Sequence, residues 1–106
     1  MTAEHKKNIA YLMVISGRKQ KADLLKFLTE MKASVVNVSY GIGSVKNNSP
    51  LIEIFGFVPE EDKVIITCLL SHEKANDVID LLEKVFDFNK ANTGIAFTIG
   101  VDCLSF

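Results

Sequence analysis

The sequence predicts an α+β fold, because strand-like and helix-like patterns alternate along the chain and the second half repeats the order of the first. The chain has 106 residues, of which 48 % are hydrophobic and 24 % are charged. These values are typical of a soluble globular domain, and they exclude a disordered, collagen-like or disulfide-stapled chain. We therefore expect one domain over residues 1–106.

The first half of the chain is predicted to form a strand, a helix and a strand. Residues 9–15 are an unbroken apolar run followed by Ser16-Gly17, which is typical of a short strand buried on both faces. Between residues 18 and 32, apolar side chains recur at helical spacing, with Ser16 as the expected N-cap. Residues 34–40 alternate and are rich in β-branched side chains, as strands are.

The second half repeats this order. Residues 63–70 predict a third strand, Ser71 is the expected N-cap of a second helix, and residues 94–101 predict the fourth strand. The apolar stripe of the second helix consists of Ala75, Val78, Ile79, Leu82 and Phe86. Two β-α-β halves in tandem predict the ferredoxin-like β-α-β-β-α-β sandwich, an antiparallel four-stranded sheet with two helices on one face.

The sheet face without helices is predicted to be apolar. Both alternating sets of side chains in residues 9–15 are apolar, and the third and fourth strands behave in the same way. A face of roughly several hundred Å² left apolar in water would be an association surface. We expect it to close against other copies of the chain; the alternative is that the N-terminal arm and a long loop cover it.

Charge, cysteine content and hydropathy limit the classes of partner and the cellular location that we expect. Twelve basic and 13 acidic residues leave a net charge of −1, with no basic excess to attract nucleic acid. Residues 1–32 nevertheless carry seven bases against three acids, which we interpret as solvated helix faces. Two cysteines do not suggest a disulfide framework, and no apolar stretch approaches the ~20 residues that cross a bilayer. We expect a cytoplasmic protein without direct membrane insertion.

A long loop at residues 41–62 connects the second and third strands, where a hairpin needs only two to five residues. Ser49-Pro50 is a cap followed by proline at the first helical position, and Gly56 suits a helix end, so residues 50–55 are predicted to form a short helix. This loop is either a partner-binding element or a permanently packed part of the protein. Its expected binding side chains are Leu51, Ile54, Phe55 and Phe57.

Catalytic and metal-binding patterns are not found in the sequence. The two histidines and two cysteines show no metal-ligand spacing, although a subunit interface could still assemble a site. Glycines at residues 41–44 would let backbone N–H groups approach an anion, but they are too few for a dinucleotide-binding fingerprint. Residues 89–94 could present hydrogen-bond donors to a ligand or simply form a turn, and both interpretations stay open.

The order of elements, the long loop and the string NTGIAFTIGV at residues 92–101 resemble the PII family of nitrogen-regulatory signalling proteins. The resemblance covers residues 9 to about 102 and is greatest to the divergent PII-like branch. It implies a cytoplasmic homotrimer, not an enzyme, that binds ATP or ADP as a small-molecule effector in clefts between subunits. It also implies signal transduction to a target protein through the long loop, here residues 44–58.

The same resemblance assigns candidate ligand residues. At the loop base, residues 41–44 keep the family's two glycines and replace its arginine by Ser44. In the second loop Lys90 and Gly94 survive, Ile95 replaces the final phosphate-binding lysine, and the family's arginine-rich C-terminal segment has no counterpart. Each lost cation removes roughly 1.5–3 kcal/mol of phosphate binding, so we expect weak ATP binding and assign no certain cofactor. The implied ligand-binding residues are Gly41, Gly43, Ser44, Lys90, Asn92, Thr93 and Gly94.

Two other classes of function remain open. The first is a small enzyme or metal-binding trimer on the same fold, with His72, Cys68 or Cys103 at an interface. The second is an oligomeric interaction module that binds no ligand.

Overall fold

A computed structural model describes residues 8–42, 62–90 and 93–105 of the chain. Its elements confirm the predicted order and agree closely with the predicted strand limits. In chain order they are strand β1 (Ile9–Gly17), 3₁₀ helix η1 (Arg18–Gln20), helix α2 (Lys21–Glu30), strands β2 (Ser34–Ile42) and β3 (Asp62–Ser71), helix α4 (His72–Val85) and strand β4 (Gly94–Gly100).

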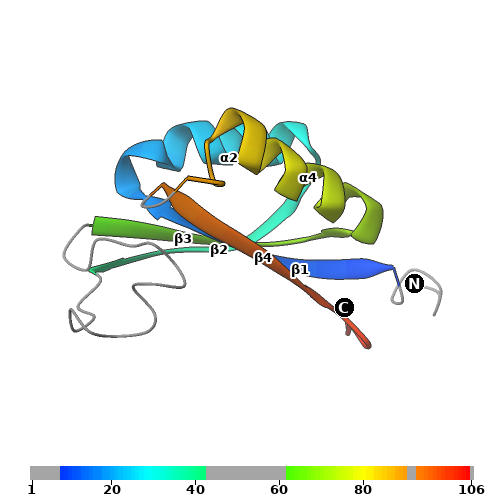
Figure 1. Cartoon of the computed structure of the whole chain (residues 1–106). Helices are drawn as coiled ribbons and strands as arrows, with labels where there is room; N and C mark the ends of the chain where they lie inside the picture. The colour runs from blue at the N-terminus through cyan, green and yellow to red at the C-terminus, as the bar shows by residue number, and fades with distance from the viewer. Residues whose placement is uncertain (1–7, 43–61, 91–92, 106) are drawn as a thin grey trace, which may run out of the picture.

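The four strands form one sheet in the order β2-β3-β1-β4, and every neighbouring pair is antiparallel. Helices α2 and α4 both lie on the same face of this sheet, and no helix of the described residues lies on the other face (Figure 1). This arrangement confirms the predicted ferredoxin-like sandwich. Neither of the two described α-helices is long and apolar enough to cross a membrane.

The hydrophobic core lies between the sheet and the two helices. Side chains of β1 alternate strictly between buried and half-buried, so only one face of the strand is fully buried within the single chain. The prediction that residues 9–15 are buried on both faces is therefore wrong for the isolated subunit. The core side chains that are completely buried include Leu12 and Val14 of β1, Leu24 and Leu28 of α2, Val64 and Ile66 of β3, and Val78 of α4.

Ser16 is not the N-cap of the first helix, contrary to the sequence-based expectation. The 3₁₀ helix η1 separates Ser16 from α2, whose N-cap position is Gln20. Ser16 instead lies within β1, opposite Gly94 of β4, and is completely buried. Its hydroxyl donates a 2.8 Å hydrogen bond to Oε1 of Gln20, which satisfies this buried polar group.

Ser71 is the N-cap of α4, as predicted. Its side-chain oxygen accepts a 3.3 Å hydrogen bond from the backbone N–H of Lys74, one of the four N–H groups that a helix start leaves without a helical partner. Glu73 in the first turn adds a negative charge near the positive end of the helix.

We expect Ser71→Ala to lower the free energy of unfolding by about 1 kcal/mol, because the N–H of Lys74 loses its acceptor. Urea unfolding at fixed protein concentration measures this change. Ser71→Asp keeps an acceptor at the same position and should retain most of the stability. Equal losses in the two variants would contradict a capping role.

The two cysteines differ in environment and should differ in reactivity. Cys68 is buried in the core, whereas Cys103 is exposed, and both are free thiols. Burial raises the pKa of the Cys68 thiol from 9.0 to about 11, so thiolate is scarce there at neutral pH.

We expect a thiol reagent at pH 8 to label Cys103 alone in the native protein and both cysteines in denaturant. Between pH 9 and about 11 the unfolded state loses the Cys68 proton first, so stability should fall as pH rises through this range. Equal labelling rates for the two native thiols would contradict the buried position of Cys68.

Candidate functional site

The described candidate ligand residues lie at one end of the sheet but on its opposite edges. Gly41 is near the end of β2 and Gly94 begins β4, while β3 and β1 lie between these two strands. The registers place Gly41 and Gly17 opposite Lys63, and Ser16 opposite Gly94. Three steps of ~4.8 Å between strands separate the two edges by roughly 14 Å. Among the described residues, one subunit therefore does not bring Gly41 and Gly94 together.

Several predicted site residues lie outside the described residues. They are Gly43 and Ser44 of the loop base, Asn92 of the second loop, and the four expected partner-binding side chains Leu51, Ile54, Phe55 and Phe57. The short helix predicted at residues 50–55 also lies outside this part of the chain, as does most of the region 44–58.

An aromatic cluster holds the start of the loop before β4. The ring of Phe86 lies 5.3 Å from that of Phe27 in α2 and 6.4 Å from that of Phe88. The chain turns at Asp87, whose φ of 59° is in the left-handed region. The backbone N–H of Lys90 donates to the carbonyl of Asp87 at 2.9 Å, while its ammonium lies exposed, 3.6 Å from the Asp87 carboxylate. The loop thus presents the charge of Lys90 to solvent from a packed base.

Thr93 connects this loop to β1. Its carbonyl oxygen lies 3.4 Å from the Ser16 hydroxyl, which also has the Gln20 side chain within hydrogen-bond distance. A hydroxyl has one proton to donate, so at any moment Ser16 donates to only one of these two acceptors. Ser16 thereby lies within hydrogen-bond distance of both Thr93 and Gln20, the N-cap position of α2.

Gly94 packs closely against the ring of Phe88. A Cβ built on Gly94 would lie 2.5 Å from Cζ of Phe88, with two further ring atoms closer than 3.0 Å. At Gly41, by contrast, a Cβ would meet no atom of the described residues within 4 Å. Packing against Phe88 therefore accounts for the glycine at the start of β4, whereas no contact among the described residues accounts for Gly41.

Next to Gly41 the structure assembles a group of side chains that the sequence analysis did not single out. Arg18 of η1 and Lys21 of α2 both lie over the ring of Tyr40, at 4.7 Å and 5.2 Å from its centroid. The Arg18 guanidinium is also 3.9 Å from the carboxylate of Asp62, at the start of β3. The basic excess of residues 1–32 was the only sequence signal for this group.

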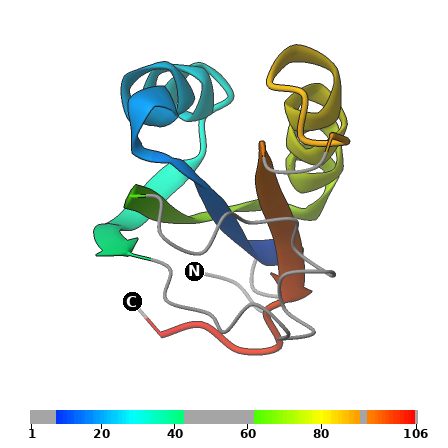
Figure 2. The ribbon, with the colours of Figure 1, turned by 60° about the vertical axis from the view of Figure 1, so that its left-hand side comes forward.

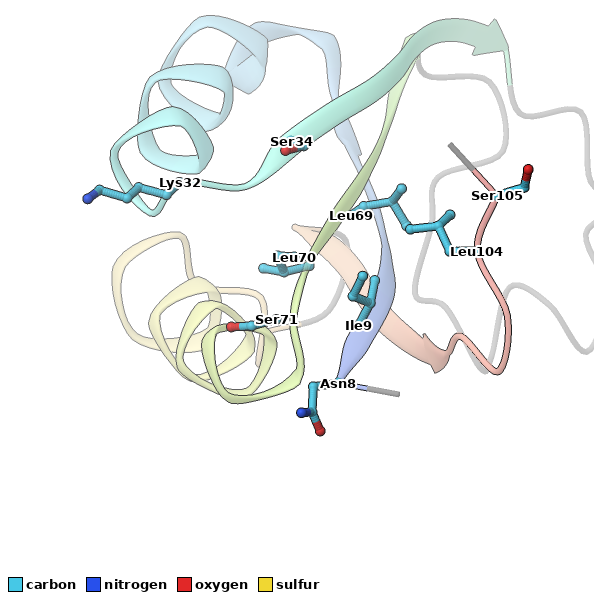
Figure 3. Close-up of a pocket in the computed structure, with 9 residues that line it drawn as sticks. All are labelled: Asn8, Ile9, Lys32, Ser34, Leu69, Leu70, Ser71, Leu104 and Ser105. Atoms are coloured by element: carbon cyan, nitrogen blue, oxygen red, sulfur yellow. The ribbon is translucent and has the colours of Figure 1, made fainter. Parts of the chain in front are cut away.

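A separate hollow of about 610 Å³ lies at the opposite end of the sheet. In Figure 3 the side chains of Leu69 and Leu104 approach one another on the sheet face opposite α2 and α4, here called the open sheet face, with Ile9 beside them. The remaining lining residues are Asn8, Lys32, Ser34, Leu70, Ser71 and Ser105. None of the predicted ligand residues lines this hollow.

Within residues 8–42, 62–90 and 93–105, no three histidine, cysteine or acidic side chains lie together in a way that could hold a metal ion. Of the residues considered for an interfacial metal site, His72 and Cys103 are exposed and Cys68 is inside the core.

Comparison with known proteins identifies the fold class. Neither a protein-family model nor a curated protein sequence matches the chain. Among solved structures, the PII-like signalling protein TTHA0516 of Thermus thermophilus matches with a TM-score of 0.64 at 15 % identity, over 88 % of this chain and 86 % of that one. CPII of Thiomonas intermedia, solved with ADP, AMP and acetate, matches with a TM-score of 0.57 at 14 % identity, over 85 % and 82 %.

The chain therefore has the fold of PII-like signalling proteins, as the resemblance seen in its sequence predicted. The agreement extends over most of both chains in each comparison. The similarity is one of fold, at 14–15 % sequence identity.

Proposed function

We propose that this protein is a PII-like regulatory protein and not an enzyme. It assembles as a cytoplasmic homotrimer, binds a small effector of the adenine-nucleotide class in clefts between subunits, and acts on a target protein through residues 44–58. The observation that carries the proposal is the placement of the two glycine-containing loop bases at the same sheet end but on opposite edges. A cleft that uses both needs a second copy of the chain.

Three features support this assignment. No atom of the described residues would meet a Cβ on Gly41, and Lys90 presents its charge from a loop that an aromatic cluster holds in place. The sheet face without helices carries exposed large apolar side chains, including Phe97 and Ile99 of β4, which suits a surface that packs against other copies. CPII, which shares the fold, was solved with adenine nucleotides bound.

ATP is expected to bind much more weakly than in typical PII proteins, because Ser44 and Ile95 stand where the family has cations. Isothermal titration calorimetry with ATP, ADP and AMP at physiological salt measures this. We expect ATP dissociation constants well above micromolar, with no ATP hydrolysis. A submicromolar ATP constant would contradict the expectation and would require phosphate contacts from other residues.

Hydrogen exchange tests the role of residues 44–58. We expect their amide protection to change when an effector or partner binds. Protection equal to that of β1 and β3 and unchanged by any ligand would mean that the loop is structural and carries no signal.

A further inference from the structure

We propose that Arg18 and Lys21 form an anion-binding site beside Gly41 that takes the phosphate or pyrophosphate group of a small ligand. The site deepens the proposed function, on which it rests for the identity of the complete ligand. Its positive charge comes from the first helical segment rather than from either loop.

The geometry concentrates two cations at one edge of the sheet. Both charged groups lie over the ring of Tyr40, within the ~6 Å range of cation–π contact, so the two charges are within about 10 Å of each other. Residues three apart at the start of a helix share a face, which explains why Arg18 and Lys21 reach the same ring. Tyr40 directly precedes Gly41 in β2, so the cations lie next to the backbone of Gly41, near which no described residue would contact an added Cβ.

The two cations near Tyr40 repel one another, so an anion between them would be stabilised. η1 contains no acidic residue, and Asp23 is the acidic residue in the first turn of α2. The ring of Tyr40 offsets part of the repulsion between Arg18 and Lys21, and a bound anion would offset more.

The ion pair with Asp62 is too long and too exposed to satisfy the Arg18 guanidinium. Their closest approach of 3.9 Å is about 1 Å longer than a charge-assisted hydrogen bond, and the two side chains are 42 % and 60 % exposed. Exposed ion pairs of this kind contribute little to stability. Asp62 also places a negative charge beside the cations, where it would compete with an incoming anion.

A phosphate group is the ligand that best fits the guanidinium of Arg18 and the ammonium of Lys21. The planar guanidinium of Arg18 matches two phosphate oxygens at once, and the ammonium of Lys21 adds a second charge with three donors. A pyrophosphate group offers enough oxygens for both. These cations would partly replace those that are absent at Ser44 and Ile95.

Calorimetric titration with inorganic pyrophosphate tests the site directly. Arg18→Gln and Lys21→Gln should each weaken binding about tenfold or more, and the effect should shrink as salt rises. Lys26→Gln is the matched control, because Lys26 is an exposed cation on the same helix and takes no part in the Tyr40 contact. Asp62→Asn should tighten pyrophosphate binding, since it removes the competing charge. Circular dichroism verifies that each variant is folded.

The outcomes separate this site from the proposed function. No pyrophosphate binding to the wild-type protein at millimolar concentration, or equal affinity in Arg18→Gln, Lys21→Gln and Lys26→Gln, would overturn the site even if a nucleotide binds. Pyrophosphate binding that depends on Arg18 and Lys21, together with no binding of ATP, ADP, AMP or adenosine, would support the site and overturn the adenine-nucleotide assignment.

Discussion

Ile99→Asp is expected to convert the proposed trimer into monomers. Ile99 of β4 pairs with Tyr11, one of the half-buried positions of β1, so both side chains lie on the sheet face opposite the core. Figure 2 shows α2 and α4 together on the other face of the sheet. It is 56 % exposed in the single subunit, so a carboxylate there costs the monomer little. In an oligomer closed through this face the same carboxylate would be buried without a partner, at a cost of the order of several kcal/mol in each subunit.

Light scattering after size-exclusion chromatography measures the effect. Wild-type protein should have three times the 11.7 kDa subunit mass, and Ile99→Asp should have the subunit mass. The control is Val85→Asp, because Val85 is 64 % exposed but lies at the end of α4 in the helical layer. Monomeric wild-type protein at micromolar concentration, or dissociation by both variants alike, would overturn the assembly through the open sheet face.

Gly94→Ala is expected to lower the free energy of unfolding by about 1–3 kcal/mol. The added methyl group would overlap the ring of Phe88, and Phe88 packs edge-on against Phe86. The ring must move away and lose part of this aromatic packing, which is the usual cost of overfilling a well-packed site. Thermal or urea unfolding at one fixed protein concentration measures the change.

A double-mutant cycle isolates the cause. With Phe88→Ala the ring is absent, so adding Gly94→Ala should cost much less than it does in the wild-type protein. The paired variant also separates packing from the proposed ligand binding, because it removes the steric clash without restoring glycine at position 94. Strictly additive effects of the two substitutions would mean that the Phe88 ring is not what requires glycine at this position.

Local patterns were enough to predict the architecture. Each informative pattern involves residues that are close together in the sequence. These patterns are the alternation in residues 34–40, the helical spacing of apolar residues before Lys32 and after Ser71, and the N-cap at Ser71. Such short-range chemistry is readable from the chain order alone. It identified each described strand and α-helix and, through the tandem repeat, the ferredoxin-like fold.

Ser16 shows where local reasoning stops. A serine before a helical pattern is a reasonable N-cap, but the sheet register draws Ser16 into β1 opposite Gly94, and η1 is inserted after it. The glycine at position 94 likewise depends on Phe88, because the ring of Phe88 occupies the space that a Cβ on residue 94 would enter. Neither requirement is visible in the spacing of residue types.

The candidate site depends most on the way the chain folds back on itself. Strand order places Gly41 and Gly94 at one end of the sheet yet roughly 14 Å apart, a separation that follows from two intervening strands. The same folding brings Tyr40 against Arg18 and Lys21, about twenty residues earlier in the chain. Residue types determine which local elements form, but contacts between distant segments arise only when burial of the common core fixes how those elements pack.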